Sequence, residues 1–479
     1  MSQPRVVVAV LAYGSLLVAV LQTLVVPVIG EIQAELGVSA SAASWAITAN
    51  LLAAAVCTPV IGRLGDLRGR RSVMIGVMVL VLAGSVLAAV TTSLPLLLVA
   101  RVLQATSFGL SPLLIATLRE ELPAERLTGA MALISGMIAV GAGVGVAVTG
   151  FFMRSGGDYH QLFWLSSALT ALGLLGFLAL PSRAAAAIGR IDWTGAVLLG
   201  AGLVLLVMPL EQGNTWGWGS PETLGSLAGS VLLLTLFVLV ERRVTHPLVT
   251  VKMLRHRPIA VANVAGLFMG FAFFAIFLSI SALVQAPPAV AGYGFGSTVL
   301  AASLVYLLPG TAGGIITAPL GGRLVNAFGA KATLVLAALL AAAGFAFLAL
   351  VHATTWQVIA GSVAVNTGVM FGYAALPALI VQHVDRAETG IANSMNSIVR
   401  SVGMSLGTAF VVALLARNLV PGAALPAESQ FTWIFVVGAA LSGVTAFVLA
   451  LALPRSRPTG RTVADADKVE VFAAPGQMR

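Results

Sequence analysis

The sequence predicts an all-α integral membrane protein that crosses the bilayer about fourteen times. Two observations lead to this fold class. First, 59% of the 479 residues are hydrophobic and only 9% are charged, with a mean hydropathy of +1.01, whereas a soluble globular chain carries roughly 25% charged residues. Second, the apolar residues gather in runs of about 20, the length of helix that crosses a hydrocarbon layer. Lipid must therefore be the solvent for most of the surface.

The apolar runs are separated by short polar loops and define the expected spans and regions. The spans are expected at residues 6–28, 44–62, 72–92, 95–118, 127–152, 160–181, 193–210, 222–240, 258–284, 297–319, 331–351, 355–380, 389–415 and 430–453. They group into an N-terminal six-helix bundle over residues 1–185, an inserted transmembrane helix pair over 186–245, a C-terminal six-helix bundle over 246–455 and a disordered cytoplasmic tail over 456–479.

The basic residues predict how the chain is oriented. Most of the 26 Lys and Arg residues lie in loops on the side of the N-terminus, whereas Arg154 and Arg417 lie on the other side. Because positive loops stay in the cytoplasm, we expect a multi-pass protein of the cell membrane with both termini cytoplasmic. The basic residues form no stripe on a folded domain, so no nucleic-acid partner is expected. The single cysteine, Cys57, lies within a span and supports neither a disulfide framework nor a metal site.

A loop motif occurs twice in the chain and predicts two related halves. The first copy reads Gly62-x-Leu-Gly-Asp66-x-x-Gly69-Arg70-Arg71, and the second runs from Gly322 to Lys331 with Asn326 in place of the acid. Glycines permit a tight turn, and Asp66 can accept hydrogen bonds from Arg side chains and helix N-termini. A generic basic loop is the alternative interpretation. Two halves of like orientation would place a substrate site between them near the middle of the membrane.

The first copy of the motif resembles the loop signature of the major facilitator superfamily. Together with the expected span count, it resembles the fourteen-span drug:proton antiporter (multidrug exporter) family. The resemblance implies a major facilitator fold of two six-helix bundles plus two inserted helices. It also implies that this loop acts as a cytoplasmic gate that latches the outward-facing state.

Two further motifs lie within the expected fourth and fifth spans. An intramembrane Arg costs at least a few kcal/mol, so Arg101 should face protein or a water-filled cavity. Arg101 and Gln104 resemble the family's fourth-span motif, which implies a role in proton coupling; an Arg that braces helices through backbone carbonyls is the alternative. Gly141 and Gly145 resemble the antiporter motif without its Pro, and close helix packing accounts for them equally well.

Other polar side chains within the spans are candidates for the substrate cavity. Asn393, Asn396 and Arg400 recur at i, i+3 and i+7 and therefore share one helix face. Hydrogen bonding between helices is the alternative role for all of these residues. An aromatic and Met-rich run over residues 268–277 could supply an adaptable apolar wall. The isolated candidates are Gln22, Asn50, Gln104 and Asn366.

The acidic residues make the coupling mechanism the least determined part of the prediction. The family commonly carries an acid in its first span, and Val18 stands at that position here. We expect no acid in the middle of a span, with Glu211 at an outer end or in a loop. The candidate titrating groups are therefore Glu31 and Glu35 near the outer end of the first span and Asp66 in the inner loop.

The sequence predicts a transporter and not an enzyme, because no cluster of acids, nucleophiles or metal ligands lies at membrane depth. The resemblance implies a secondary exporter of amphipathic drugs or metabolites, and hence antibiotic resistance, that works by alternating access coupled to proton influx. The alternative is an exporter or facilitator of an endogenous anionic metabolite or lipid, not obligatorily proton-coupled. The expected partners are a small amphipathic substrate, protons and membrane lipids. The chain is expected to act as a monomer without a cofactor, with the proton gradient as its energy source.

Overall fold

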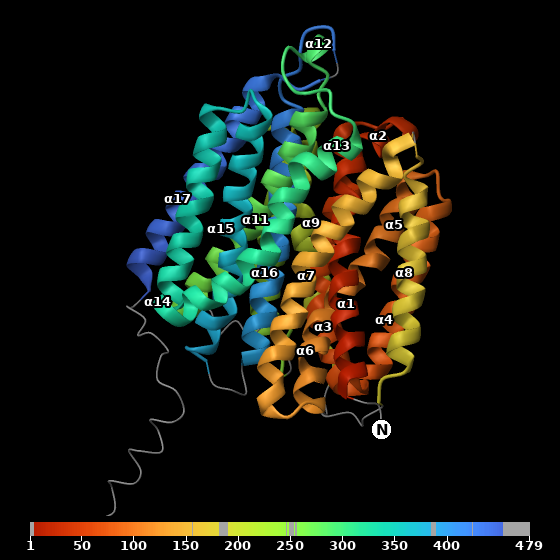
Figure 1. Cartoon of the computed structure of the whole chain (residues 1–479), viewed down its shortest axis with the longest axis vertical. Coiled ribbons are helices and arrows are strands. Elements are labelled where there is room, and N and C mark those ends of the chain that lie inside the picture. The colour runs from red at the N-terminus through yellow and green to blue at the C-terminus, as the bar shows by residue number, and fades with distance from the viewer. Residues whose placement is uncertain are drawn as a thin grey trace, which may run out of the picture.

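The computed structural model describes residues 4–155, 157–181, 190–245, 247–248, 253, 256–384, 389–423 and 425–453. Within these residues the regular elements are helices, and extended backbone pairs only at an isolated bridge between Leu419 and Pro426. Most of the helices run side by side along the long axis of the molecule (Figure 1). The predicted all-α class is confirmed.

The helices fall into two large groups and a pair between them. The first group is α1 (Pro4–Thr23), η1 (Val26–Val28), α2 (Ile29–Leu36), α3 (Ala40–Arg68), α4 (Arg70–Val90), α5 (Leu94–Ala105), η2 (Thr106–Gly109), α6 (Leu110–Glu121), α7 (Ala124–Phe152), η3 (Met153–Ser155) and α8 (His160–Leu178). The pair is α9 (Trp193–Trp216) and α10 (Pro221–Glu241). The second group is α11 (Arg257–Gln285), α12 (Pro288–Ala291), α13 (Val299–Ala301), the π-helical η5 (Ala302–Leu307), α14 (Leu308–Leu350), α15 (Thr355–Val381), α16 (Thr389–Leu415) and α17 (Glu428–Ala452). These groups are called the first half, the inserted pair and the second half.

Twelve helical segments among the described residues are long and apolar enough to cross a membrane. The expected spans 127–152 and 297–319 fall on α7 and on the segment from α13 into α14. Only shorter apolar pieces of these two, Val140–Phe152 and Val299–Thr311, lie within the residues searched. The chain is therefore a multi-pass membrane protein, and the count of fourteen spans stays a prediction, as do the bounds of the four regions. The predicted tail over 456–479 lies outside the described residues.

Local sequence signals explain where several helices begin. Ser39 caps α3 by accepting a hydrogen bond from the Ala42 amide, and Asp192 caps α9 by accepting one from the Gly195 amide. Ser220 caps α10 in the same way. Such caps satisfy backbone donors that have no partner inside the helix. The boundaries of the inserted pair are thus set by residues that the loops supply.

The halves meet along two lateral seams and at one end. α3 of the first half packs on α16 of the second, and α7 packs on α14. α9 packs against both α3 and α16, whereas α10 packs mainly on α9.

We call the end that holds Arg70, Arg71 and Lys331 the basic end. α2 and α12 lie at the opposite end (Figure 1).

Candidate functional site

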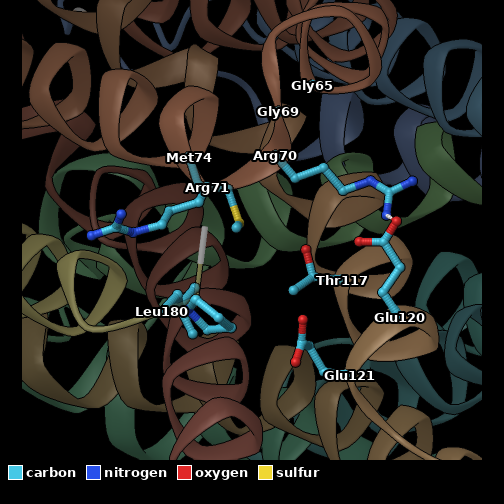
Figure 2. Close-up of a pocket in the computed structure, with 10 residues that line it drawn as sticks. Gly65, Gly69, Arg70, Arg71, Met74, Thr117, Glu120, Glu121 and Leu180 are labelled. Carbon is cyan, nitrogen blue, oxygen red and sulfur yellow. Dashed lines mark ion pairs between the residues drawn. The ribbon is translucent and has the colours of Figure 1, made fainter. Parts of the chain in front are cut away.

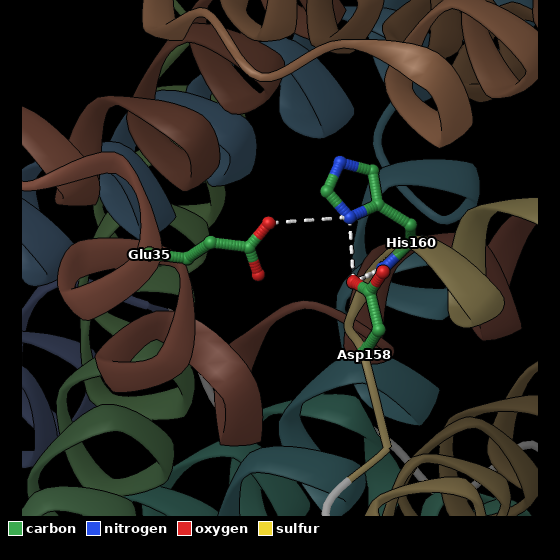
Figure 3. Close-up of side chains that lie close together, drawn as sticks. All are labelled: Glu35, Asp158 and His160. Carbon is green, nitrogen blue, oxygen red and sulfur yellow. Dashed lines mark hydrogen bonds and ion pairs between the residues drawn. The ribbon is translucent and has the colours of Figure 1, made fainter.

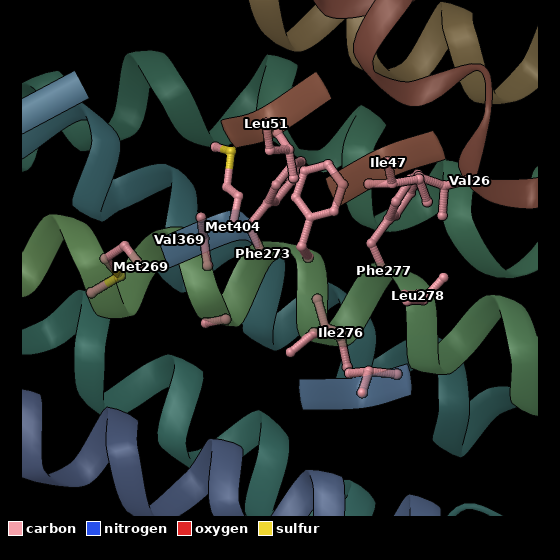
Figure 4. Close-up of a cluster of buried hydrophobic side chains, with 14 of the residues drawn as sticks. Val26, Ile47, Leu51, Met269, Phe273, Ile276, Phe277, Leu278, Val369 and Met404 are labelled. Carbon is pink, nitrogen blue, oxygen red and sulfur yellow. The ribbon is translucent and has the colours of Figure 1, made fainter. Parts of the chain in front are cut away.

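Apolar side chains from both halves fill the interface between them toward the opposite end. Six of these side chains, three from each half, are buried and belong to one hydrophobic cluster. Figure 4 shows the side chains of η1 and α3 turned toward those of α11 and α16. We call this set the seam cluster: Val26, Ile47 and Leu51 from the first half, and Phe273, Phe277 and Met404 from the second.

Aromatic rings form the second-half wall of the seam cluster. Phe273 and Phe277, one turn apart on α11, stack with their ring centroids 6.1 Å apart. Phe273 also lies 6.3 Å from the ring of Tyr373 on α15. Of the aromatic and Met-rich run over residues 268–277, Phe273 and Phe277 reach the interface. Such rings and the Met404 thioether form a polarisable apolar surface with few directional contacts.

Two of the predicted cavity residues supply the polar groups at this interface. Gln22 on α1 donates from Nε2 to the Met404 sulfur at 3.4 Å, which joins the two halves. The Arg400 guanidinium lies over the Tyr373 ring, 4.7 Å from its centroid. Its Nη2 donates to the Ser397 hydroxyl at 3.4 Å. Its Nε is buried without a hydrogen-bond partner, and no carboxylate of the described residues forms an ion pair with it.

Arg101 instead lies inside the first half, 2% exposed, between α3, α4 and α5. Its Nε donates to the Ala46 carbonyl at 2.8 Å and its Nη1 to the Gln104 amide oxygen at 2.5 Å. Gln104 in turn donates to Ser85, and Asn50 donates to the Arg101 carbonyl. These contacts are those of the bracing alternative, because guanidinium and amide groups join three helices of one half. No ion pair to Arg101 occurs among the described residues.

The remaining predicted polar residues lie within the second half. Asn366 donates to the Ser362 carbonyl of its own helix at 3.0 Å. Asn396 donates to the Ala262 carbonyl of α11 at 2.9 Å, so it joins α16 to α11. Asn393 is half-buried on the same helix. Of the eight predicted cavity residues, Gln22 contacts the seam cluster at Met404, and Arg400 lies beside it over Tyr373.

The predicted gate loop forms a compact cluster at the basic end, around a pocket (Figure 2). Gly69 turns the chain between α3 and α4 with a φ of 87°, which a side chain would disfavour. Arg70 pairs with Asp66 at 3.6 Å and closely with Glu120 at the end of α6. Gly62 faces the ring of Pro112 on α6. The contacts of this loop thus join α3, α4 and α6 of the first half.

The two copies of the loop motif have matching geometry. Gly329 interrupts α14 with a φ of 84°, close to the value at Gly69. Arg71 donates to the carbonyl of Leu178 at the end of α8 at 2.6 Å, and Lys331 donates to that of Leu453 after α17. In each half the basic residue therefore ties the loop to the last helix. Cationic groups are favoured at such helix C-termini.

The candidate acids of the first span lie at the opposite end. Glu31 and Glu35 on α2 are both exposed. Glu35 lies 3.5 Å from Nδ1 of His160, which also contacts Asp158 at 2.5 Å (Figure 3). The other ring nitrogen of His160 faces the Thr91 carbonyl at 2.8 Å. With acceptors at both ring nitrogens, this cluster fits an ion pair that joins α2, α8 and the loop after α4.

Acidification is expected to loosen this cluster through Asp158. Burial alone would raise the pKa of Asp158, but hydrogen bonds from the His160 amide and ring hold it below its usual range. Its contribution to stability is therefore present above the ordinary Asp pKa of about 3.9 and is lost as the pH falls through the lower folded value. The melting temperature of wild type should fall more steeply below about pH 4 than that of Asp158→Asn. Glu31→Gln, an exposed acid on the same end, is the control; equal slopes for all three proteins would contradict the assignment.

The acid that the sequence prediction misplaced is Glu211. The expected span ended at residue 210, which left Glu211 outside it, but α9 continues to Trp216 and buries the Glu211 side chain. Ser44 and Thr48 of α3 contact its carboxylate at 2.5 and 2.8 Å. The sequence signal that could have placed it correctly lies after the acid, where the helix continues through Gly213 to Trp216. The predicted span was ended at the first charged residue after the apolar run, which left Glu211 outside it.

Comparison with known proteins agrees with this architecture. The sequence model of the Major Facilitator Superfamily matches residues 11–408 and again residues 270–478. The tetracenomycin C resistance and export protein of Streptomyces glaucescens is 28% identical over 85% of this chain and 75% of its own length. Multidrug resistance protein 3 of Bacillus subtilis is 26% identical over 84% and 78%, and the uridine/deoxyuridine transporter of Lactococcus lactis is 29% identical over 63% and 64%.

Solved structures share the fold. A POT family peptide transporter superimposes with a TM-score of 0.69 at 14% identity, covering 97% of this chain and 99% of that one. The xylose transporter XylE from E. coli gives a TM-score of 0.65 at 14% identity, covering 97% and 100%. The predicted major facilitator fold and a transport function, not an enzymatic one, are thereby confirmed. The chain belongs to the Major Facilitator Superfamily.

Proposed function

We propose that the chain exports amphipathic small molecules across the cell membrane by alternating access, driven by proton influx, with both termini in the cytoplasm. The observation that carries the proposal is the seam cluster, in which Phe273, Phe277 and Met404 face the first half. An apolar, polarisable wall accepts ligands of different shapes because it makes few directional contacts. The relatives named for drug resistance and antibiotic export support the same substrate class.

A second candidate is export of an anionic amphipathic compound. Arg400 supports it, because its guanidinium lies beside the seam cluster with a buried Nε that has no partner among the described residues. A ligand carboxylate or phosphate would supply that partner. This candidate does not require proton coupling.

Transport by the purified protein in proteoliposomes tests both candidates. An imposed proton gradient should drive accumulation of ethidium, a cationic aromatic probe, and a protonophore should abolish it. Ethidium flux that is unchanged by the protonophore would reject proton coupling. Arg400→Gln should leave ethidium transport within about twofold of wild type but lower transport of an anionic dye such as fluorescein about tenfold if the anion pairs with Arg400.

The control for this variant is Arg417→Gln, because Arg417 is exposed after the end of α16. It should transport both dyes as wild type does. Equal fluorescein transport by both variants would reject the anionic candidate. Phe273→Ala should weaken transport of every aromatic probe, and an unaltered apparent affinity for all of them would remove the seam cluster as the binding surface.

A further inference from the structure

The inserted helix α9 carries a buried acid that none of the predicted transport residues accounts for. Glu211 is 3% exposed and faces α3. Its Oε2 lies 2.5 Å from the Ser44 hydroxyl and its Oε1 lies 2.8 Å from the Thr48 hydroxyl. Ser44 and Thr48 are one turn apart, so they form a single polar patch on α3. A buried carboxyl group needs such partners, since leaving it without hydrogen bonds costs several kcal/mol.

The hydroxyl groups can satisfy Glu211 in both of its protonation states. Ser44 has one hydroxyl hydrogen but two acceptors, Glu211 Oε2 and the Ser41 carbonyl, which lies 2.7 Å away. When the carboxylate is ionised, Ser44 and Thr48 each donate to one of its oxygens. When Oε2 carries a proton, it donates to Ser44, whose own hydrogen turns to the Ser41 carbonyl. Rotation of one hydroxyl group therefore accommodates gain or loss of a proton.

Among the described residues, no charged side chain forms an ion pair with the Glu211 carboxylate. The helices packed on α9 are α3, α10 and α16. Within the described part of the chain, the polar side chains that contact the carboxylate are Ser44 and Thr48. The charges of α3 lie about 22 Å or more beyond Thr48 along that helix. The charged side chains of the three helices are Arg63, Asp66 and Arg68 on α3, Glu222 and Glu241 on α10, and Arg400 on α16.

The position of α9 links this carboxyl group to both halves of the molecule. The Ser41 hydroxyl of α3 donates to the Glu211 carbonyl, which fixes α9 to the first half. Three residues further on, Asn214 donates from Nδ2 to the Ala413 carbonyl of α16 at 2.6 Å, which fixes it to the second. α3 and α16 themselves meet along a seam. A change in the strength of the hydrogen bonds between α9 and α3 therefore affects the seam along which the two halves must move.

We propose that Glu211 is a proton-binding site through which the inserted pair couples the proton gradient to movement of the two halves. This inference rests on the proposed function. Water at the opposite end supplies the proton, because Glu211 lies about 7.5 Å along α9 from its last residue, Trp216. Protonation converts the carboxylate into a neutral acid. It thereby replaces charge-assisted hydrogen bonds to α3 by weaker neutral ones, and loss of the proton restores them.

Infrared difference spectroscopy of the full chain in lipid nanodiscs tests the proton site directly. The carboxylic-acid C=O band should disappear between about pH 4 and pH 9, a window that covers ordinary and buried Glu residues. Glu211→Gln should lack one component of this band, and Thr48→Val, which keeps the acid but removes a donor, should shift that component. Glu222→Gln, an exposed acid of the same helix pair, should keep it. Identical wild-type and Glu211→Gln spectra would overturn the proposal.

Transport assays then separate proton binding from coupling. Glu211→Gln should keep ethidium counterflow within about twofold of wild type but lose gradient-driven accumulation by about tenfold, as expected for loss of a coupling free energy. Gradient-driven accumulation at the wild-type level in Glu211→Gln would overturn the coupling role. If wild type itself shows no gradient-driven accumulation, the proposed function fails, and the infrared result still decides whether Glu211 binds a proton.

Discussion

Replacing Arg101 with Ala is expected to lower the free energy of unfolding by about 2 kcal/mol, because two hydrogen bonds to a charged group, each of about 1.5–3 kcal/mol, are lost. Removing the charge from the membrane stabilises the protein by about 2.5–3.5 kcal/mol and so offsets part of this loss. The cavity left by the side chain lowers the free energy of unfolding further. Arg101 fixes α3 at the Ala46 carbonyl, next to Ile47 of the seam cluster. If about 1.4 kcal/mol of this loss raises the barrier of the rate-limiting transport step, the transport rate falls about tenfold.

Thermal unfolding in detergent and ethidium flux in proteoliposomes measure these two effects. Arg101→Lys keeps the charge but cannot reach Ala46 and Gln104 at once with a single ammonium group. It should therefore lose nearly as much stability as Arg101→Ala if Arg101 braces the helices. Full stability of Arg101→Ala together with lost transport would show instead that the charge acts in the transport path. Arg154→Ala, at an exposed position in η3, is the control and should be neutral.

Replacing Gly145 with Ala is expected to destabilise the first half by about 1–3 kcal/mol, the usual cost of overpacking. A methyl group at Gly145 would clash with the Thr23 hydroxyl and lie 3.0 Å from the Val20 carbonyl of α1. Gly141 is equally close to α1, where a methyl group would lie 2.9 Å from Cβ of Ala19. Small residues one turn apart thus let α1 and α7 approach. The structure accounts for both glycines by close helix packing.

The control for Gly145→Ala is Gly76→Ala. Gly76 lies in α4 with open space around it, so the substitution should be neutral or stabilise the helix by up to about 1 kcal/mol. The melting temperature should therefore fall in Gly145→Ala and stay the same or rise in Gly76→Ala. A Gly145→Ala protein with wild-type stability but altered coupling would favour the gating role implied by the antiporter motif.

The fold was predictable because it depends on local properties of the sequence. Apolar runs of spanning length and the repeated glycine turn identify helices and related halves without knowledge of their neighbours. Gly69 and Gly329 adopt the same positive φ because the same short turn is required twice. The loop residues Asp66 and Arg70 were likewise identified from one short motif, and they do contact each other.

The candidate site was only partly predictable, because the direction of a polar side chain depends on which helix lies beside it. Asn396 and Arg400 share a stripe of α16, yet Asn396 bonds to α11 and Arg400 lies over Tyr373. Arg101 was expected to face protein or water, and its partner on α3, the Ala46 carbonyl, could not be deduced from its own helix. Glu211 was missed for a different reason, since hydropathy counts a charge against a span whether or not it has hydrogen-bond partners.

The place of the inserted pair has a consequence for substrates that dissolve in the bilayer. Of the two lateral seams between the halves, the pair packs on the one between α3 and α16 and not on the one between α7 and α14, as far as the described residues go. A lipophilic compound that diffuses within one leaflet would therefore meet a covered flank on one side of the transporter and an uncovered flank on the other. A compound that has partitioned into the membrane would then enter the central interface from one direction, past α7 and α14.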